Sequence, residues 1–148
     1  MNAKDAAKIS GVSVRALHHY DAISLLSPSR TLENGYREYS DDDMDRLQQI
    51  LLFKECGFSL AQIKELLNSP CFDREKAFDL QRKLLLHENR RIESMLETLE
   101  KSVQNMKGKM KMGIKDKFQG FDFTNNPYED ESRRLWGDKV VEQGNAHI

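Results

Sequence analysis

Residues 9–39 read ISGVSVRALHHYDAISLLSPSRTLENGYREY, and this stretch decides the fold. Gly11 separates two segments with helical patterning, because glycine tolerates the left-handed backbone that ends a helix. Pro28 stops the second segment, and Asn34-Gly35 favours the tight turn of a β-hairpin. The order helix, tight turn, helix and hairpin is typical of a winged helix-turn-helix, whose second helix lies in the major groove of DNA beside a β-loop.

Two further helices are predicted after the hairpin, which is expected over 31–39. Ser40 precedes three aspartates, a pattern that marks a helix start because acidic side chains favour the positive end of the helix dipole. That helix is expected to end before the glycine of ECGFS. Ser59 caps the next helix, and Pro70 closes it. We therefore assign residues 1–70 to a winged helix-turn-helix DNA-binding domain.

A long helix is predicted over about 73–111, where the chain has no proline and no glycine before Gly108. From Ile92 onward the apolar residues are spaced 4, 3, 4, 3 and 4 apart, which is the heptad seam of a coiled coil. A helix of this length and pattern needs a partner, so 71–112 is the expected dimerisation segment. The expected dimer contacts are Leu85, Ile92, Leu96, Leu99, Val103 and Met106.

The start of the coiled coil has two interpretations. If the heptad register extends backwards from Ile92, Asn89 and Arg82 occupy seam positions, where polar residues fix the register at a cost in stability. Alternatively, the coiled coil begins only at Leu85. The spacing of the apolar residues is compatible with both.

The chain changes character after the long helix. Glycines and the run Asn125-Asn126-Pro127 interrupt the helical pattern, and a last helical piece is expected over 129–141. A segment of about 35 residues is too short to build a core of its own. Residues 113–148 therefore dock on the long helix, are disordered, or form a linker and the start of a truncated domain.

The composition argues against several classes of protein. The 148 residues carry a formal net charge of −1, from 23 basic and 24 acidic side chains, so binding to DNA would depend on where the charges lie. Cys56 and Cys71 form neither a disulfide framework nor a zinc site by their spacing, and no metal or cofactor is expected. No long apolar run or signal-peptide core is present, so we expect a cytoplasmic protein with no membrane partner.

Three segments resemble the MerR family of transcription regulators: 11–30 (GVSVRALHHYDAISLLSPSR), 33–40 (ENGYREYS) and 56–67 (CGFSLAQIKELL). The resemblance runs from about Lys4 to Lys107. It implies a mainly α-helical homodimer, joined by antiparallel coiled-coil pairing of the long helix and bound to palindromic double-stranded promoter DNA. It also implies an activator at the bacterial nucleoid that distorts the promoter for RNA polymerase.

The segment NNPYEDESRRLWGD at 125–138 resembles the opening of the sensor domain in the TipA-type, drug-sensing subgroup of this family. This resemblance implies that the full-length protein responds to a small organic effector such as an antibiotic. Only the first part of the sensor would be present. The chain is therefore expected to be a DNA-binding and dimerisation piece with a truncated sensor.

Basic, aromatic and polar side chains of the first domain are the candidate DNA contacts. Arg15 falls in the first turn of the recognition helix, where a guanidinium can bridge the acceptors of guanine or bind a phosphate. His18 stands where many family members have arginine, and His19 either contacts DNA or packs half-buried. The full expected set is Arg15, His18, His19, Tyr20, Arg30, Tyr36, Arg37, Tyr39 and Ser59, the last at a helix N-terminus able to hold a phosphate.

Other functions fit the sequence less well. An enzyme is not expected, because the chain has no glycine-rich phosphate loop, no H-E-x-x-H motif and no nucleophile elbow. A metal or redox sensor of the same family is disfavoured, since no cysteine follows Cys71. The alternative kept open is a coiled-coil scaffold or adaptor without specific DNA binding.

Overall fold

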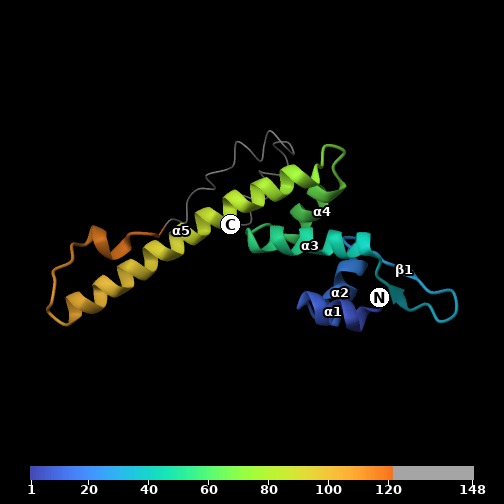
Figure 1. Ribbon diagram of the computed structural model, residues 1–148, viewed down its shortest axis with the longest axis horizontal. Coiled ribbons are helices and arrows are strands. Elements are labelled where there is room, and N and C mark those ends of the chain that lie inside the picture. Colours follow the sequence, from blue (N-terminus) through green and yellow to red (C-terminus); the bar gives the residue numbers. More distant parts are fainter. Residues whose placement is uncertain (122–148) are drawn as a thin grey trace. The chain divides into compact units, whose positions relative to one another are not determined.

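The computed structural model describes residues 1–121, which form a mainly helical structure with one two-stranded antiparallel hairpin (Figure 1). This confirms the predicted fold class. The described part of the chain divides into two compact units, 1–72 and 73–121. The elements are α1 (Ala3–Ser10), α2 (Val14–Ala22), β1 (Ser29–Arg30), β2 (Arg37–Glu38), α3 (Asp41–Glu55), α4 (Leu60–Asn68), α5 (Arg74–Met106) and the 3₁₀ helix η1 (Lys115–Phe118).

Side-chain caps begin helices α2, α3 and α4, and the sequence predicts those at Ser40 and Ser59. The Ser13 hydroxyl accepts a hydrogen bond from the Ala16 amide at 3.0 Å and so starts α2. Ser40 and Asp43 form a capping box at α3, and Ser59 and Gln62 form another at α4. In each box two amides that lack a partner within the helix are satisfied, which typically stabilises a helix by about 1 kcal/mol.

The core of the first unit comes from one face of each helix. Leu17 of α2, Ile50 and Phe53 of α3, and Ile63 and Leu66 of α4 are fully buried. Burying a side chain of this size contributes roughly 1.5–3 kcal/mol. This core fixes α2 with its opposite face in solvent.

The hairpin differs from its predicted bounds, because its paired residues are Ser29 with Glu38 and Arg30 with Arg37. The loop is longer than a two-residue turn at Asn34-Gly35: the Thr31 amide donates to the Tyr36 carbonyl at 2.9 Å, and the Gly35 amide donates to the Thr31 carbonyl at 2.9 Å. Gly35 has a φ of +70°, which explains the glycine. The strands therefore begin before Thr31.

The long helix α5 spans 33 residues and ends at Met106, earlier than the predicted end near residue 111. Gly108, with a φ of +75°, and a hydrogen bond from the Lys109 amide to the Gln104 carbonyl at 3.0 Å turn the chain there. The last step of the predicted heptad seam, Met110, therefore lies outside the helix. Within the described residues, no helix is long and apolar enough to cross a membrane.

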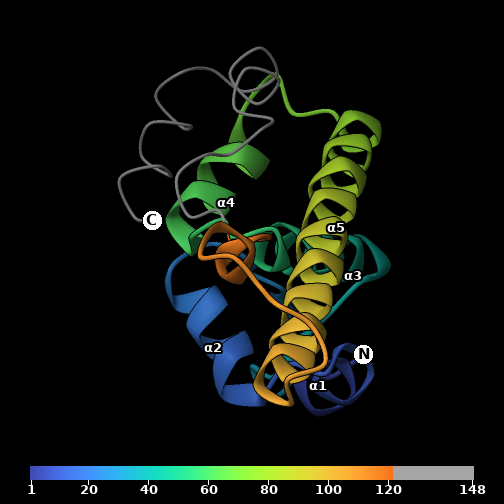
Figure 2. The ribbon, with the colours of Figure 1, turned by 90° about the vertical axis from the view of Figure 1, so that its left-hand side faces the viewer.

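The chain after Gly108 runs back alongside α5, as Figures 1 and 2 show. The Thr98 hydroxyl donates to the Gln119 carbonyl at 2.8 Å, and the Met112 amide donates to the Asn105 side chain at 3.1 Å. Up to residue 121, the alternative in which the segment docks on the long helix is thus confirmed. The helical piece predicted over 129–141 lies outside the described residues.

Candidate nucleic-acid interface

Helix α2 has one buried and one exposed face. Leu17 and Tyr20 are buried, whereas Arg15, His18 and His19 are exposed. Arg15 lies three residues from His18 and four from His19, a spacing that places all three side chains on one side of a helix. The structure thus brings three of the predicted contact residues together and excludes the half-buried packing considered for His19.

The wing, residues 29–38, carries three more of the predicted contacts. Tyr36 is highly exposed, Arg30 is exposed and Arg37 is half-buried. Both arginines reach the same oxygen of Asp21, Arg37 through Nε at 2.7 Å and Arg30 through Nη2 at 3.2 Å. The hydrogen bond from Arg37 holds the pKa of the Asp21 carboxyl below its usual value, against the opposing effect of burial. A hydrogen bond from the Ser27 side chain and the positive charges of the two arginines add to the lowering.

Sequence reasoning missed Asp21, although a signal was present. An acidic side chain in the last turn of a helix faces the negative end of the helix dipole, which is unfavourable unless a cation lies nearby. Asp21 is the last residue but one of α2. Its position therefore indicated a basic partner, which the fold supplies from the wing.

Tyr39, one of the predicted DNA contacts, is a buried residue of the first unit. Its side chain is only 2% exposed, and its hydroxyl is buried without a hydrogen-bond partner within the described residues. Burial raises the pKa of the Tyr39 phenol. Tyr39 is thus a core residue next to β2, and its predicted contact with DNA stays a prediction. Tyr20 is equally buried, and its predicted contact with DNA likewise stays a prediction.

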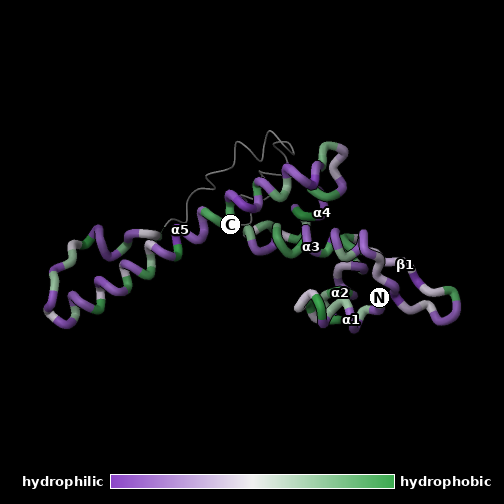
Figure 3. The backbone as a smooth tube through the Cα atoms, viewed as in Figure 1, coloured by the Kyte–Doolittle hydropathy of each residue, from purple (hydrophilic) through white to green (hydrophobic). Residues whose placement is uncertain are grey.

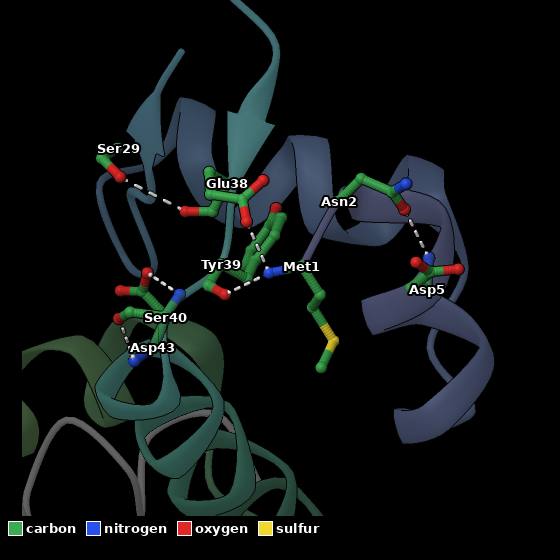
Figure 4. Close-up of polar contacts among 8 residues, drawn as sticks. All are labelled: Met1, Asn2, Asp5, Ser29, Glu38, Tyr39, Ser40 and Asp43. Carbon is green, nitrogen blue, oxygen red and sulfur yellow. Dashed lines mark hydrogen bonds and ion pairs between the residues drawn. The ribbon is translucent and has the colours of Figure 1, made fainter.

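The start of the chain supports the wing, as Figure 4 shows. The Met1 amino group lies 2.8 Å from Glu38 Oε1 and 2.8 Å from the Tyr39 carbonyl, and the Tyr39 amide donates to the Met1 carbonyl at 2.7 Å. Asn2 forms an isolated antiparallel bridge with Glu38. These contacts tie β2 to the chain just before α1, so the wing base is held on both sides.

The phosphate site predicted at Ser59 offers fewer free backbone amides than expected. The Ser59 amide donates to the Gln62 side chain at 3.0 Å, and the Gln62 amide donates to the Ser59 hydroxyl at 3.2 Å. The capping box therefore uses two of the amides at the start of α4. A phosphate there would bind the amides of Leu60 and Ala61, and this contact stays a prediction.

The predicted dimer seam of α5 is accessible to a partner. Leu96 and Leu99 are 59% and 61% exposed, Leu85, Ile92 and Met106 are also exposed, and Val103 is half-buried. Apolar residues recur between hydrophilic ones along this helix (Figure 3). A seam of large apolar side chains on a single exposed helix is typical of a surface that pairs with a second helix.

Comparison with known proteins decides the family. Residues 1–70 match the family described as MerR HTH family regulatory protein, and residues 44–107 match the one described as MerR, DNA binding. The chain belongs to the MerR family. Its relatives include the HTH-type transcriptional activator mta of Bacillus subtilis, 43% identical over 145 residues that cover 95% of this chain and 56% of the relative.

Two further MerR proteins show the same likeness. The HTH-type transcriptional activator TipA of Streptomyces coelicolor is 39% identical over 132 residues, which cover 88% of this chain and 52% of TipA. The crystal structure of the HTH-type transcriptional regulator SkgA from Caulobacter crescentus is 38% identical, with a TM-score of 0.72 over 91% of this chain and 94% of that chain. The chain spans about half the length of mta and TipA.

These comparisons confirm two expectations from the sequence. The relatives are transcriptional regulators rather than enzymes, and their names include two activators and the regulator of a multidrug-efflux transporter. The coiled-coil adaptor is not favoured, because the matched families are DNA-binding regulators. Within residues 1–121, no group of three or more His, Cys, Asp or Glu side chains is placed to hold a metal ion.

Proposed function

We propose that this MerR-family chain binds a palindromic promoter site as a homodimer and activates transcription by distorting the DNA. One observation carries the proposal: α2 presents Arg15, His18 and His19 on its exposed face, and the wing is joined to its C-terminal end through Asp21. This is the pairing of recognition helix and flanking β-loop that reads a major groove and its backbone.

Arg15 is the proposed reader of the groove. It is exposed in the first turn of α2, and within the described residues it has no ion-pair partner. A guanidinium there can donate two hydrogen bonds to the O6 and N7 atoms of guanine, or it can bind a phosphate. His18 and His19 add further hydrogen-bonding groups on the same exposed face of α2.

The exposed α5 seam is the proposed dimer contact. Antiparallel pairing of two such helices creates a two-fold axis, which repeats α2 and the wing on the second half of the site. The operator is therefore expected to be palindromic. Pairing also removes the exposed side chains of Leu96 and Leu99 from water. Full burial of each one stabilises the dimer by roughly 1.5–3 kcal/mol.

The regulation of the whole protein is proposed from its relatives. The names of mta and TipA describe activators, and a further relative is the multidrug-efflux transporter 2 regulator of Bacillus subtilis. A promoter distorted by the dimer, contact with RNA polymerase at the bacterial nucleoid, and a small organic effector in the full-length protein follow by analogy. The residues described here supply the DNA-binding and dimerisation parts of that mechanism.

The proposal is tested by titrating this chain into labelled DNA from upstream of its own coding region at a low and a higher salt concentration. Arg15→Ala should weaken binding about tenfold or more, since one base or phosphate contact is worth roughly 1–3 kcal/mol. The matched control is Lys54→Ala, which removes an exposed positive charge from the end of α3. Equal effects of the two variants would contradict the role of α2.

A further inference from the structure

The wing bridge, formed by Asp21, Arg30 and Arg37, joins the last turn of α2 to both strands of the wing. Arg37 Nε lies 2.7 Å and Arg30 Nη2 lies 3.2 Å from Asp21 Oδ2. Arg30 Nη1 also donates to the Gly35 carbonyl at 3.2 Å, which braces the loop of the hairpin. One carboxylate oxygen therefore holds the recognition helix, both strands and the loop of the wing together.

The two arginines of the bridge differ in how many N–H donors they keep free for a ligand. The side chain of Arg37 is 22% exposed and that of Arg30 is 53% exposed. Arg37 uses only Nε in the bridge, and within residues 1–121 its two terminal nitrogens donate no hydrogen bond. A guanidinium has five N–H donors in a fixed plane, so four donors of Arg37 stay available in an orientation that Asp21 sets. Arg30 uses both of its terminal nitrogens internally.

The wing gains from such a bridge because its own strands are short and the contacts with Met1 and Asn2 hold only its base at β2. Each strand has two residues, and an isolated two-stranded hairpin of this size is not stable in water. A free arginine side chain also loses rotamer freedom when it is fixed on a ligand, and this loss weakens binding. Because Asp21 already holds Arg37 in the folded protein, the side chain loses its rotamer freedom during folding and not when it binds DNA.

We infer that Asp21 is a positioning residue that fixes Arg37 and the wing to α2, so that helix and wing bind the DNA as one rigid reader. The inference rests on the proposed DNA binding. It has a second consequence, because a carboxylate near the DNA backbone repels phosphate. At the cognate site the fixed geometry of Arg37 and the wing outweighs this repulsion, so Asp21 raises the affinity. On unrelated DNA, binding depends only on charge, so Asp21 lowers the affinity.

The test compares cognate and unrelated duplexes for Asp21→Asn and for a matched control, Glu33→Gln. Both variants remove one negative charge from the same region, but Glu33 is exposed in the wing loop and has no ion-pair partner within the described residues. Asp21→Asn should lose about tenfold in the ratio of cognate to unrelated affinity, which is within the coupling expected inside one ion-pair network. Glu33→Gln should leave this ratio unchanged. Equal ratios for the two variants would overturn the inference.

A double-mutant cycle separates positioning from a general loss of structure. Arg37→Lys keeps the charge but removes the Nε–H that binds Asp21. If Asp21 acts through Arg37, the double variant should lose no more cognate affinity than Arg37→Lys alone, because Asp21→Asn has nothing left to disturb. Losses that simply add would show that the two residues act independently and would contradict the bridge.

The bridge is also tested without DNA, which separates its failure from a failure of the proposed function. In the free protein the Thr31 amide is hydrogen-bonded across the wing loop to Tyr36. Asp21→Asn should speed hydrogen exchange at this amide severalfold, while amides of the α3 core exchange as in the wild type. Unchanged exchange at Thr31 would overturn the inference even if the protein binds its operator.

Discussion

At the scale of the residue, Ser24 shows how α2 gives way to the wing. The Leu25 amide donates to the Tyr20 carbonyl at 2.8 Å and the Ser24 amide donates to the Asp21 carbonyl at 3.0 Å, the two bonds of a Schellman motif. Ser24 has a φ of +59° at the position where glycine is usual. An L-residue in this conformation costs roughly 1–2 kcal/mol.

Ser24→Gly should therefore stabilise the protein. Removing the side chain relieves the strain, while the greater freedom of glycine in the unfolded chain takes back part of the gain. We expect the free energy of unfolding to rise by up to about 1 kcal/mol in a urea titration. Ala22→Gly, two residues earlier in helical conformation, should instead lower it by a similar amount. A loss of stability in Ser24→Gly would contradict this account of the turn.

The two cysteines should differ sharply in reactivity. Burial raises the pKa of the Cys56 thiol to about 11, with a smaller contribution from Glu55. Cys71 is exposed. Because the thiolate is the reactive form, iodoacetamide at about pH 8 should modify Cys71 in the folded protein and leave Cys56 intact until the chain unfolds. The labelling is measured by mass spectrometry of the native protein, and equal labelling of the two cysteines would contradict the prediction.

At the scale of the element, the sequence predicts what is local and fails where distant segments meet. The helix starts at Ser13, Ser40 and Ser59 follow from capping, which involves residues three apart. The pairing of Tyr39 with the start of the chain was not predictable, because it joins distant segments: the Met1 amino group donates to the Tyr39 carbonyl across 38 positions. The sequence alone gives no register for such a pairing.

The end of α5 was mispredicted for a similar reason. A heptad pattern continues to Met110, but the backbone turns at Gly108, and the segment that follows finds partners on the helix. Gly120 lies against α5 with a φ of +94°, and a Cβ placed there would lie 2.9 Å from the Met95 amide nitrogen and 2.9 Å from Ser94 Oγ. The returning segment thus requires glycine at this position.

Gly120→Ala should detach the returning segment from α5. The expected result is faster hydrogen exchange at the Met112 amide, which is bonded to Asn105, with α3 and α4 unaffected. Gly108→Ala is the matched control, because Gly108 also has a positive φ but a Cβ there would meet nothing within 4 Å. It should cost only the backbone strain, roughly 1 kcal/mol. Identical exchange at Met112 in the two variants would argue against the close contact at Gly120.

At the scale of the whole molecule, the unpartnered seam of α5 predicts dimerisation. Leu99→Lys places a charge among the apolar residues that a second copy would bury, and an unpaired buried charge is strongly destabilising. Sedimentation should show the variant as a monomer at concentrations where the wild type is a dimer. Glu100→Lys, at the neighbouring exposed position, should still dimerise. A dimeric Leu99→Lys protein would place the interface elsewhere.

The central claim is that two copies of this chain bind one promoter site through α2 and the wing. The most direct measurement is sedimentation of the protein with a labelled duplex from upstream of its own coding region, beside an unrelated duplex and at two salt concentrations. We predict two chains per cognate duplex, and binding that weakens as the salt concentration rises. An excess of the unrelated duplex should compete poorly with the cognate duplex for the protein. A dimer that leaves both duplexes unbound at low salt would contradict the claim.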